Sequence, residues 1–201
     1  KEIIVQFFEN LFNAEEVGRF NKAALNLPWY YNQATNDFTG MSNEENMVHN
    51  NIKESPYFVN LLGCEKHGNS HEDIRPFVPI LQQLEKTTKR NFIDRIIRVK
   101  ANFYVKDPNY PENHYHSPHI DMWDDKKDKA DAGEIFLYYV NDSDGDTFFF
   151  NEPFKSKEYS IKKRATPKAG TGILFENSLV HASSSPRISE YRVNINFVFR
   201  S

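Results

Sequence analysis

The clearest strand pattern in the sequence is YRVNINFVF, which runs from Tyr191 to Phe199. Successive side chains on a strand point to opposite faces, so this stretch has one polar and one apolar face. The polar face carries Arg192, Asn194 and Asn196. The apolar face carries Val193, Ile195, Phe197 and Phe199. We expect the apolar face to pack beneath helices and the polar face to point into a barrel. An arginine there requires an anionic partner, because an unpaired buried charge is strongly unfavourable.

Shorter strand patterns precede this one at intervals of roughly ten residues. They cover residues 97–105, 134–141, 147–150, 158–161 and 172–176. The first alternates most regularly, and its polar face carries Arg98, Lys100, Asn102 and Tyr104. Turn-forming residues separate the later ones, as at 142–145 and 168–170. Short strands at this spacing predict an antiparallel sandwich or barrel of the jelly-roll type.

The chain up to residue 95 has mainly helical periodicity. Apolar residues at three- and four-residue steps predict one helix that includes Phe7, Phe8, Leu11 and Phe12, and another over residues 74–84. Residues 32–51, rich in Asn, Ser and Thr, predict a long loop. We therefore expect a mainly β, α+β fold in a single domain, 1–201, with helical support and a loop in 1–95 and the jelly-roll core in 96–201.

Composition and charge exclude several classes of protein. The chain has 201 residues, of which 39% are hydrophobic and 26% charged, as in ordinary soluble proteins. It has no apolar run long enough for a membrane span and no secretion-signal pattern at its start, so we expect a cytoplasmic protein without a membrane partner. The single cysteine, Cys64, excludes an internal disulfide and a thiolate zinc site. A net charge of −3 argues against a nucleic-acid partner.

A candidate metal site begins at His119-Ile120-Asp121. Residues two apart on a strand point the same way, so His119 and Asp121 can offer an imidazole and a carboxylate to one ion. The other His-x-Asp pair, His71-Glu72-Asp73, precedes a helical pattern, and we interpret its acids as helix-start residues. His116 falls on the opposite strand face, so we leave it out of the metal ligands. His181 can supply the second imidazole. Two histidines and one carboxylate leave about three coordination positions open, as in the facial triad of non-haem Fe(II) oxygenases.

From about Ile97 to the end, the chain resembles the Fe(II)- and 2-oxoglutarate-dependent dioxygenases of the prolyl-hydroxylase-like group, which includes small bacterial and phage members. The resemblance rests on the order of several short motifs, and the N-terminal helices match only in general character. The motifs are His119-Ile120-Asp121, Tyr138-Tyr139-Val140-Asn141, Gly145-Asp146-Thr147, Gly170-Thr171-Gly172, His181 and Arg192. We therefore expect a double-stranded β-helix, the two-sheet jelly roll, with the N-terminal helices packed on one sheet. A phage-encoded member would act in the host cytoplasm.

The resemblance implies that His119, Asp121 and His181 bind Fe(II). It also implies that Asp121 favours hydroxylation, because related halogenases carry a small residue at that position, which leaves room for chloride. Fe(II), one carboxylate, dianionic 2-oxoglutarate and Arg192 together sum to a formal charge near zero. The site would then contain no uncompensated buried charge.

The resemblance further implies a binding site for 2-oxoglutarate. Arg192 would grip the distal carboxylate of this cosubstrate, as its planar fork suits a bidentate contact. The Tyr139 hydroxyl would donate to the same group, and Asn196 stands where relatives place a Thr or Ser near it. Tyr104 resembles a pocket tyrosine on the strand before the iron motif, with Asn102 on the same strand face.

The function that follows is hydroxylation of a peptidyl proline or similar C–H substrate, with O2 consumed and succinate and CO2 released. The expected partner is a protein, a peptide or a small molecule. Two alternatives stay open: a non-catalytic jelly-roll module with a metal-binding or structural role, and an oxidative nucleic-acid demethylase, against which the acidic balance counts. Loops 32–51 and 124–131 are candidate substrate contacts, Trp123 is a candidate substrate wall, and the role of Arg187 is open.

Overall fold

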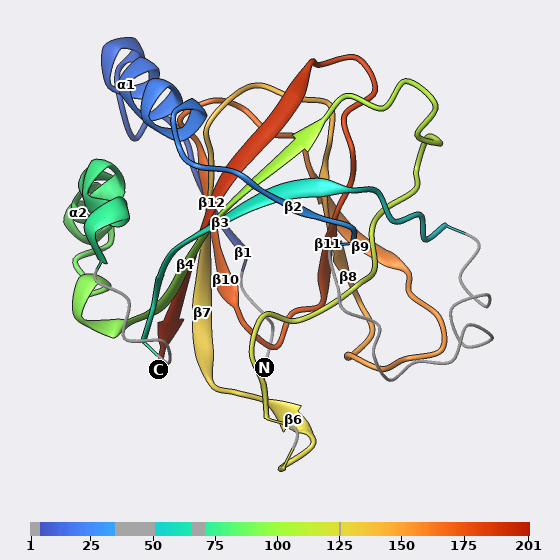
Figure 1. The fold of residues 1–201 in the computed structure, drawn as a ribbon. Coiled ribbons are helices and arrows are strands. Elements are labelled where there is room, and N and C mark those ends of the chain that lie inside the picture. The colour runs from blue at the N-terminus through green and yellow to red at the C-terminus, as the bar shows by residue number, and fades with distance from the viewer. Residues whose placement is uncertain (1–4, 35–50, 66–70, 125) are drawn as a thin grey trace.

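The computed structural model describes residues 5–34, 51–65, 71–124 and 126–201. Within these residues the largest layer is a seven-stranded antiparallel sheet in the order β1-β10-β7-β12-β4-β3-β2 (Figure 1). Its strands, in chain order, are β1 (Val5–Phe8), β2 (Tyr30–Asn32), β3 (Tyr57–Cys64), β4 (Ile96–Val105), β7 (Gly133–Tyr139), β10 (Gly172–Glu176) and β12 (Tyr191–Arg200).

A three-stranded sheet in the order β11-β8-β9 packs against one face of the large sheet. Its strands are β8 (Thr147–Phe150), β9 (Ile161–Ala165) and β11 (His181–Ser183). Buried residues of both sheets fill the space between them, among them Leu137, Tyr139, Phe149, Ile173 and Phe175. A small hairpin of β5 (Trp123–Asp124) and β6 (Lys129–Ala130) projects from the end of the barrel (Figure 1).

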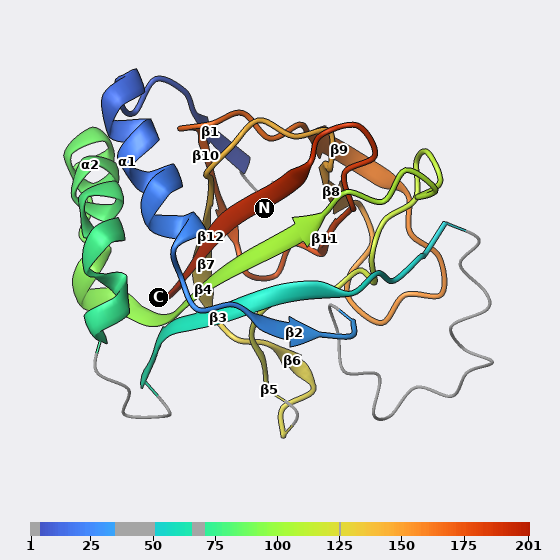
Figure 2. The ribbon, with the colours of Figure 1, turned by 45° about the horizontal axis from the view of Figure 1, so that its top comes forward.

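Two helices cover the outer face of the large sheet (Figure 2). These are α1 (Ala14–Leu25) and α2 (Val78–Thr88), and 3-10 turns occupy His71–Phe77 and Ile93–Arg95. The cluster beneath them joins helix and sheet residues, including Phe20, Ile80, Leu84, Phe136, Val193, Ile195 and Phe197. The apolar face of β12 therefore packs under the helices, and the predicted mainly β jelly roll with helices on one sheet is confirmed.

The expected helix around Phe7, Phe8, Leu11 and Phe12 was wrong. Residues Val5–Phe8 form β1, an edge strand that pairs with β10, and Phe7 is 40% exposed. The left-handed conformation of Asn10, with φ of 55°, separates this strand from α1. Pairing with a sheet edge satisfies the backbone of a short apolar run that is too short to form a stable helix.

Two further strand assignments needed correction. The segment that we expected at 158–161 pairs with β8 from Ile161 to Ala165 instead. The part of the chain expected to be helical also contributes β2 and β3, because Tyr57–Cys64 pairs along β4. Most of the predicted loop 32–51 lies outside the described residues. Among the described residues no helix combines the length and hydropathy needed to cross a membrane.

Candidate metal centre

The three predicted metal ligands lie close together in space. His119 and Asp121 lie on the segment that precedes β5, and His181 is the first residue of β11. One candidate ligand atom from each side chain lies within 4.8 Å of the other two. The imidazole centroids of His119 and His181 are 4.6 Å apart, and Nε2 of His181 is 3.5 Å from Oδ2 of Asp121. The structure therefore brings together two imidazoles and one carboxylate from distant parts of the chain.

Backbone contacts position both imidazoles. The backbones of His119 and His181 form an antiparallel bridge, with N–H to O=C distances of 2.9 and 3.0 Å. Nδ1 of His119 lies 2.9 Å from the Ser117 carbonyl, and Nδ1 of His181 lies 3.1 Å from the Leu179 carbonyl. A carbonyl only accepts, so each Nδ1 donates and each Nε2 keeps its lone pair for a metal. Burial lowers the pKa of His119 to about 4, so this ligand is neutral at physiological pH.

The Asp121 carboxylate is held by two polar side chains. The Arg98 guanidinium forms an ion pair with Oδ1, and the Asn196 amide donates to Oδ2 at 3.1 Å. Burial raises the pKa of this carboxyl, but Arg98 and His181 outweigh burial and hold the pKa well below its usual range. Asp121 is therefore ionised and oriented, as a metal ligand must be. Two imidazoles and a carboxylate on one side fit Fe(II).

Arg192 lies at the other end of the same cavity and is 1% exposed. Its Nη2 donates to the Thr147 hydroxyl at 2.9 Å, and Tyr139 donates to the same hydroxyl at 2.7 Å. The guanidinium carbon lies 5.1 Å from the Tyr104 ring centroid. Among the described residues its Nε and Nη1 have no hydrogen-bond partner, and no ion pair to Arg192 is present. A buried arginine with two unpaired donors fits a carboxylate ligand.

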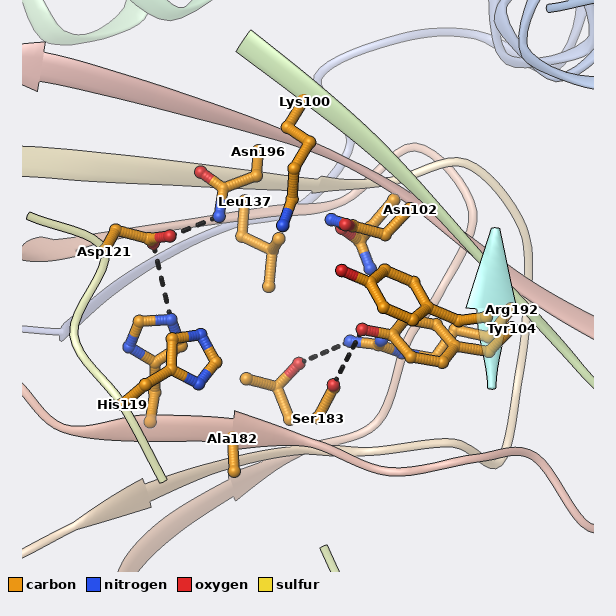
Figure 3. A pocket seen from close by; sticks show the side chains of 14 residues that line it. Lys100, Asn102, Tyr104, His119, Asp121, Leu137, Ala182, Ser183, Arg192 and Asn196 are labelled. Atoms are coloured by element: carbon orange, nitrogen blue, oxygen red, sulfur yellow. Dashed lines mark hydrogen bonds and ion pairs between the residues drawn. The ribbon is translucent and has the colours of Figure 1, made fainter. Parts of the chain in front are cut away.

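One cavity connects the two ends (Figure 3). Its floor consists of paired residues of β4 and β12, which run from Lys100 opposite Asn196 to Tyr104 opposite Arg192. His119 and Asp121 lie at one end of this floor, Arg192 and Tyr104 at the other, and Lys100 points into the space between (Figure 3). The metal ligands and the unpaired arginine thus line one cavity.

Comparison with solved structures shows where this fold occurs. A 2OG-Fe(II) oxygenase family oxidoreductase from Burkholderia pseudomallei superposes with a TM-score of 0.62 at 15% identity, over 98% of this chain and 85% of that chain. The fold is that of the 2-oxoglutarate- and Fe(II)-dependent oxygenases. No protein-family model and no curated protein sequence matches the chain.

Two other structures with the oxygenase fold differ in their reactions. A prolyl hydroxylase from Trichoplax adhaerens, in complex with a hypoxia-inducible-factor peptide, gives a TM-score of 0.58 at 13% identity, over 97% of this chain and 83% of that chain. The α-ketoglutarate-dependent epimerase SnoN of nogalamycin biosynthesis gives 0.59 at 11% identity, over 98% and 81%. At these identities the likeness shows the fold.

The oxygenase fold places most of the predicted cosubstrate residues in this cavity. Tyr104 lines it, and Asn102 donates to the Asn194 side chain at 2.9 Å on its floor. Tyr139 reaches Arg192 through their shared partner, Thr147. Asn196 differs from the expectation, because it bonds Asp121 at the metal end. It lies four residues along β12 from Arg192, or about 13 Å between Cα atoms.

Sequence reasoning missed four residues of this site. Arg98 and Lys100 were on the same polar strand face as Asn102 and Tyr104, and this shared face was the signal that could have found them. Thr147 was part of a motif without a role. Tyr57 of β3 stacks on Tyr104 at 5.0 Å, and no pattern in the sequence pointed to it. The near-zero formal charge expected for the loaded site did not count Arg98 and Lys100. These two residues add two positive charges to the sum.

Three other candidate residues lie outside the metal triad. Arg187 is 3.8 Å from Glu112 and does not line the cavity. Trp123 packs against Phe154 with ring centroids 5.1 Å apart, and its role as a substrate wall stays a prediction. His116 stacks on Tyr104 at 5.1 Å, and its ring nitrogens meet two serine hydroxyls, Ser183 and Ser185.

Proposed function

We propose that this chain is an Fe(II)- and 2-oxoglutarate-dependent oxygenase that hydroxylates a C–H bond. The observation that carries the proposal is the unpaired Arg192, which is buried in the same cavity as the three metal-ligand side chains. A metal-binding structural module needs the triad but has no use for a buried cation with two free donors. A dicarboxylic cosubstrate that chelates a metal needs both the metal-ligand triad and the buried cation.

The side chains would divide the work between the two ends of the cavity. His119, Asp121 and His181 would hold Fe(II), with their positions set by the backbone bridge and by Arg98. Arg192 would bind the distal carboxylate of 2-oxoglutarate. When bound, iron and 2-oxoglutarate supply the oxidation in which one oxygen atom of O2 enters a C–H bond and the cosubstrate leaves as succinate and CO2.

The protein also excludes water from the arginine end. Tyr104 and Tyr139 lie against the Arg192 guanidinium and are 4% and 1% exposed. In such a dry environment the ion pair between guanidinium and carboxylate is much stronger than in water. A ligand without a distal carboxylate would leave Arg192 buried and unpaired, so the cavity selects for a dicarboxylate.

We propose a peptidyl proline, or a similar C–H group on a protein or small molecule, as the substrate. The likeness to a prolyl hydroxylase in complex with a peptide supports this class. The carboxylate of Asp121 supports hydroxylation over halogenation, because it fills the position that a halide would need. Succinate release in the presence of free proline, proline-rich peptides and protein substrates tests the class directly.

The first test of the proposal is optical. We expect anaerobic addition of Fe(II) and 2-oxoglutarate to produce a weak visible charge-transfer band, which forms only when the keto acid chelates the iron. His181→Ala should abolish the band, because two of three ligands do not hold the ion in this geometry. Arg192→Met should raise the 2-oxoglutarate concentration needed for half of the band by about tenfold or more, since it removes a charge-assisted contact.

Matched controls make the result interpretable. Arg187→Met removes an exposed arginine outside the cavity and should leave the 2-oxoglutarate requirement unchanged. If the wild-type protein binds Fe(II) but gives no band with 2-oxoglutarate, the metal-binding module is correct and the oxygenase is not. If Arg192→Met leaves the requirement unchanged, the proposed role of Arg192 is wrong.

A further inference from the structure

Lys100 is a second cation in the cavity, and the proposed function does not use it. It lies on β4 opposite Asn196, and its side chain points into the cavity between the triad and Arg192 (Figure 3). Its Nζ is 5.8 Å from the Tyr57 ring centroid. Among the described residues no hydrogen bond or ion pair to this ammonium is present. The ammonium is therefore available to pair with an anionic ligand in the cavity.

The charges of the cavity identify the kind of partner. Its lining contains two cations, Lys100 and Arg192, and one carboxylate, Asp121. That carboxylate is already engaged by Arg98 and Asn196. Burial lowers the pKa of Lys100 to about 8, which still leaves it mainly protonated at neutral pH. The cavity therefore has excess positive charge before any metal binds, and it attracts a ligand with more than one negative charge.

The strand register shows where the two cations act. Arg192 pairs with Tyr104 and Asn196 pairs with Lys100, so the cations enter the cavity from two places along the same pair of strands. Lys100 is at the end near Asp121, because its partner Asn196 bonds that carboxylate. A dicarboxylate with one end at Arg192 would place its other end toward Lys100.

We infer that Lys100 binds the carboxylate of 2-oxoglutarate that adjoins the keto group, so that the cavity holds this dicarboxylate at both ends even without metal. The inference rests on the proposed function. It makes Lys100 a positioning residue, because it fixes the end of the cosubstrate that chelates the metal. The inference also predicts that 2-oxoglutarate binds partly independently of the metal, because its two carboxylates contact Arg192 and Lys100.

The test compares two acids on metal-free protein. 2-Oxoglutarate and 4-oxopentanoate share the distal carboxylate and the ketone, but the second has a methyl group where the first has the adjoining carboxylate. Calorimetric titration of chelator-treated wild-type protein should show 2-oxoglutarate binding at least about tenfold more tightly, as expected for one charge-assisted contact in a buried site. In Lys100→Met this difference should shrink to about twofold or less, while binding of 4-oxopentanoate stays nearly the same.

Controls separate this inference from the proposed function. Lys106→Met removes the same charge from an exposed pair with Glu190 and should keep the full difference between the acids. Lys100→Gln gives a second variant if Lys100→Met does not fold. An unchanged preference in either Lys100 variant overturns the inference, as does a wild-type protein that binds both acids equally. Either result leaves the proposed function standing if the iron-loaded protein still gives the charge-transfer band, whereas loss of that band removes the proposed function.

Discussion

Arg98 lies at the metal end of β4, where its guanidinium is the nearest counter-charge to Asp121. The aspartate side chain is 6% exposed and the arginine side chain 27%. When one partner of such a pair is removed, the other charge stays buried without compensation, which is more costly than losing both. In the metal-free protein, Arg98 thus supplies the counter-charge that a metal ion at this site would supply to Asp121.

The role of Arg98 as counter-charge to Asp121 predicts the stability of the Arg98→Met variant with and without metal. The metal-free variant should lose about 2 kcal/mol of stability. Mn(II) or Zn(II) should then raise its melting temperature by more than that of the wild type, because the metal replaces the missing charge. Thermal melting with and without metal measures both effects. Arg200→Met, which removes an exposed pair with Glu65, should change neither by much; an equal metal-induced rise in both variants would contradict the argument.

At this scale the sequence predicted the residues that motifs carry. Spacing and the resemblance identified His119, Asp121, His181 and Arg192, and the structure brings all four to one cavity. Residues whose roles depend on cross-strand register were missed or misplaced. Asn196 bonds Asp121 instead of lying near Arg192, because pairing between β4 and β12 decides which end of the cavity each residue meets.

Among the elements, α1 has the best-defined start. Asn13 accepts from the backbone N–H of Glu16 at 3.0 Å, and the Glu16 carboxylate accepts from the Asn13 backbone N–H at 2.9 Å. This capping box satisfies two of the N–H groups that a helix start leaves unpaired. It also explains why the helix begins after the apolar run of β1 and not within it.

The cap leads to a stability prediction for this helix. Asn13→Ala should lower the free energy of unfolding by about 1 kcal/mol, because it leaves a helix N–H without its acceptor. Asn13→Asp keeps an acceptor and should cost little. Urea denaturation followed by circular dichroism measures both. Equal losses in the two variants would show that the cap contributes nothing beyond the local backbone conformation.

Strands were predictable only where the alternation of polar and apolar residues was regular. The pattern at 97–105 and the stretch 191–199 alternate clearly, and they became β4 and β12 nearly as expected. β9 was shifted because its position depends on pairing with β8, which is a long-range property. β3 was missed because both of its faces are partly buried, so it lacks a simple alternation of apolar and polar residues.

At the scale of the whole molecule, buried histidine links stability to pH. His116 is 0% exposed, and burial lowers its pKa from 6.5 to about 3. The unfolded chain takes up this proton first as the pH falls. The contribution of neutral His116 is therefore fully present above about pH 6.5 and is lost progressively toward the lower folded value.

Stability should thus fall by about 1.5 kcal/mol between pH 6.5 and pH 5 through His116 alone. Urea midpoints across this range measure the slope for the metal-free protein. His116→Gln should flatten the slope, although it lowers stability at neutral pH by removing the contacts of the ring. Equal slopes in the wild type and His116→Gln would refute the assignment to His116.

The order of the strands has a consequence for how the protein is made. β12 is the last strand in the sequence, yet it lies between β4 and β7 near the centre of the large sheet. During synthesis on the ribosome, β4 and β7 cannot take their final places in the sheet until β12 emerges and pairs with both. The event that completes the sheet is also the one that delivers Arg192. A nascent chain therefore gains its central sheet and the buried Arg192 together, in one late step after translation of nearly the whole domain.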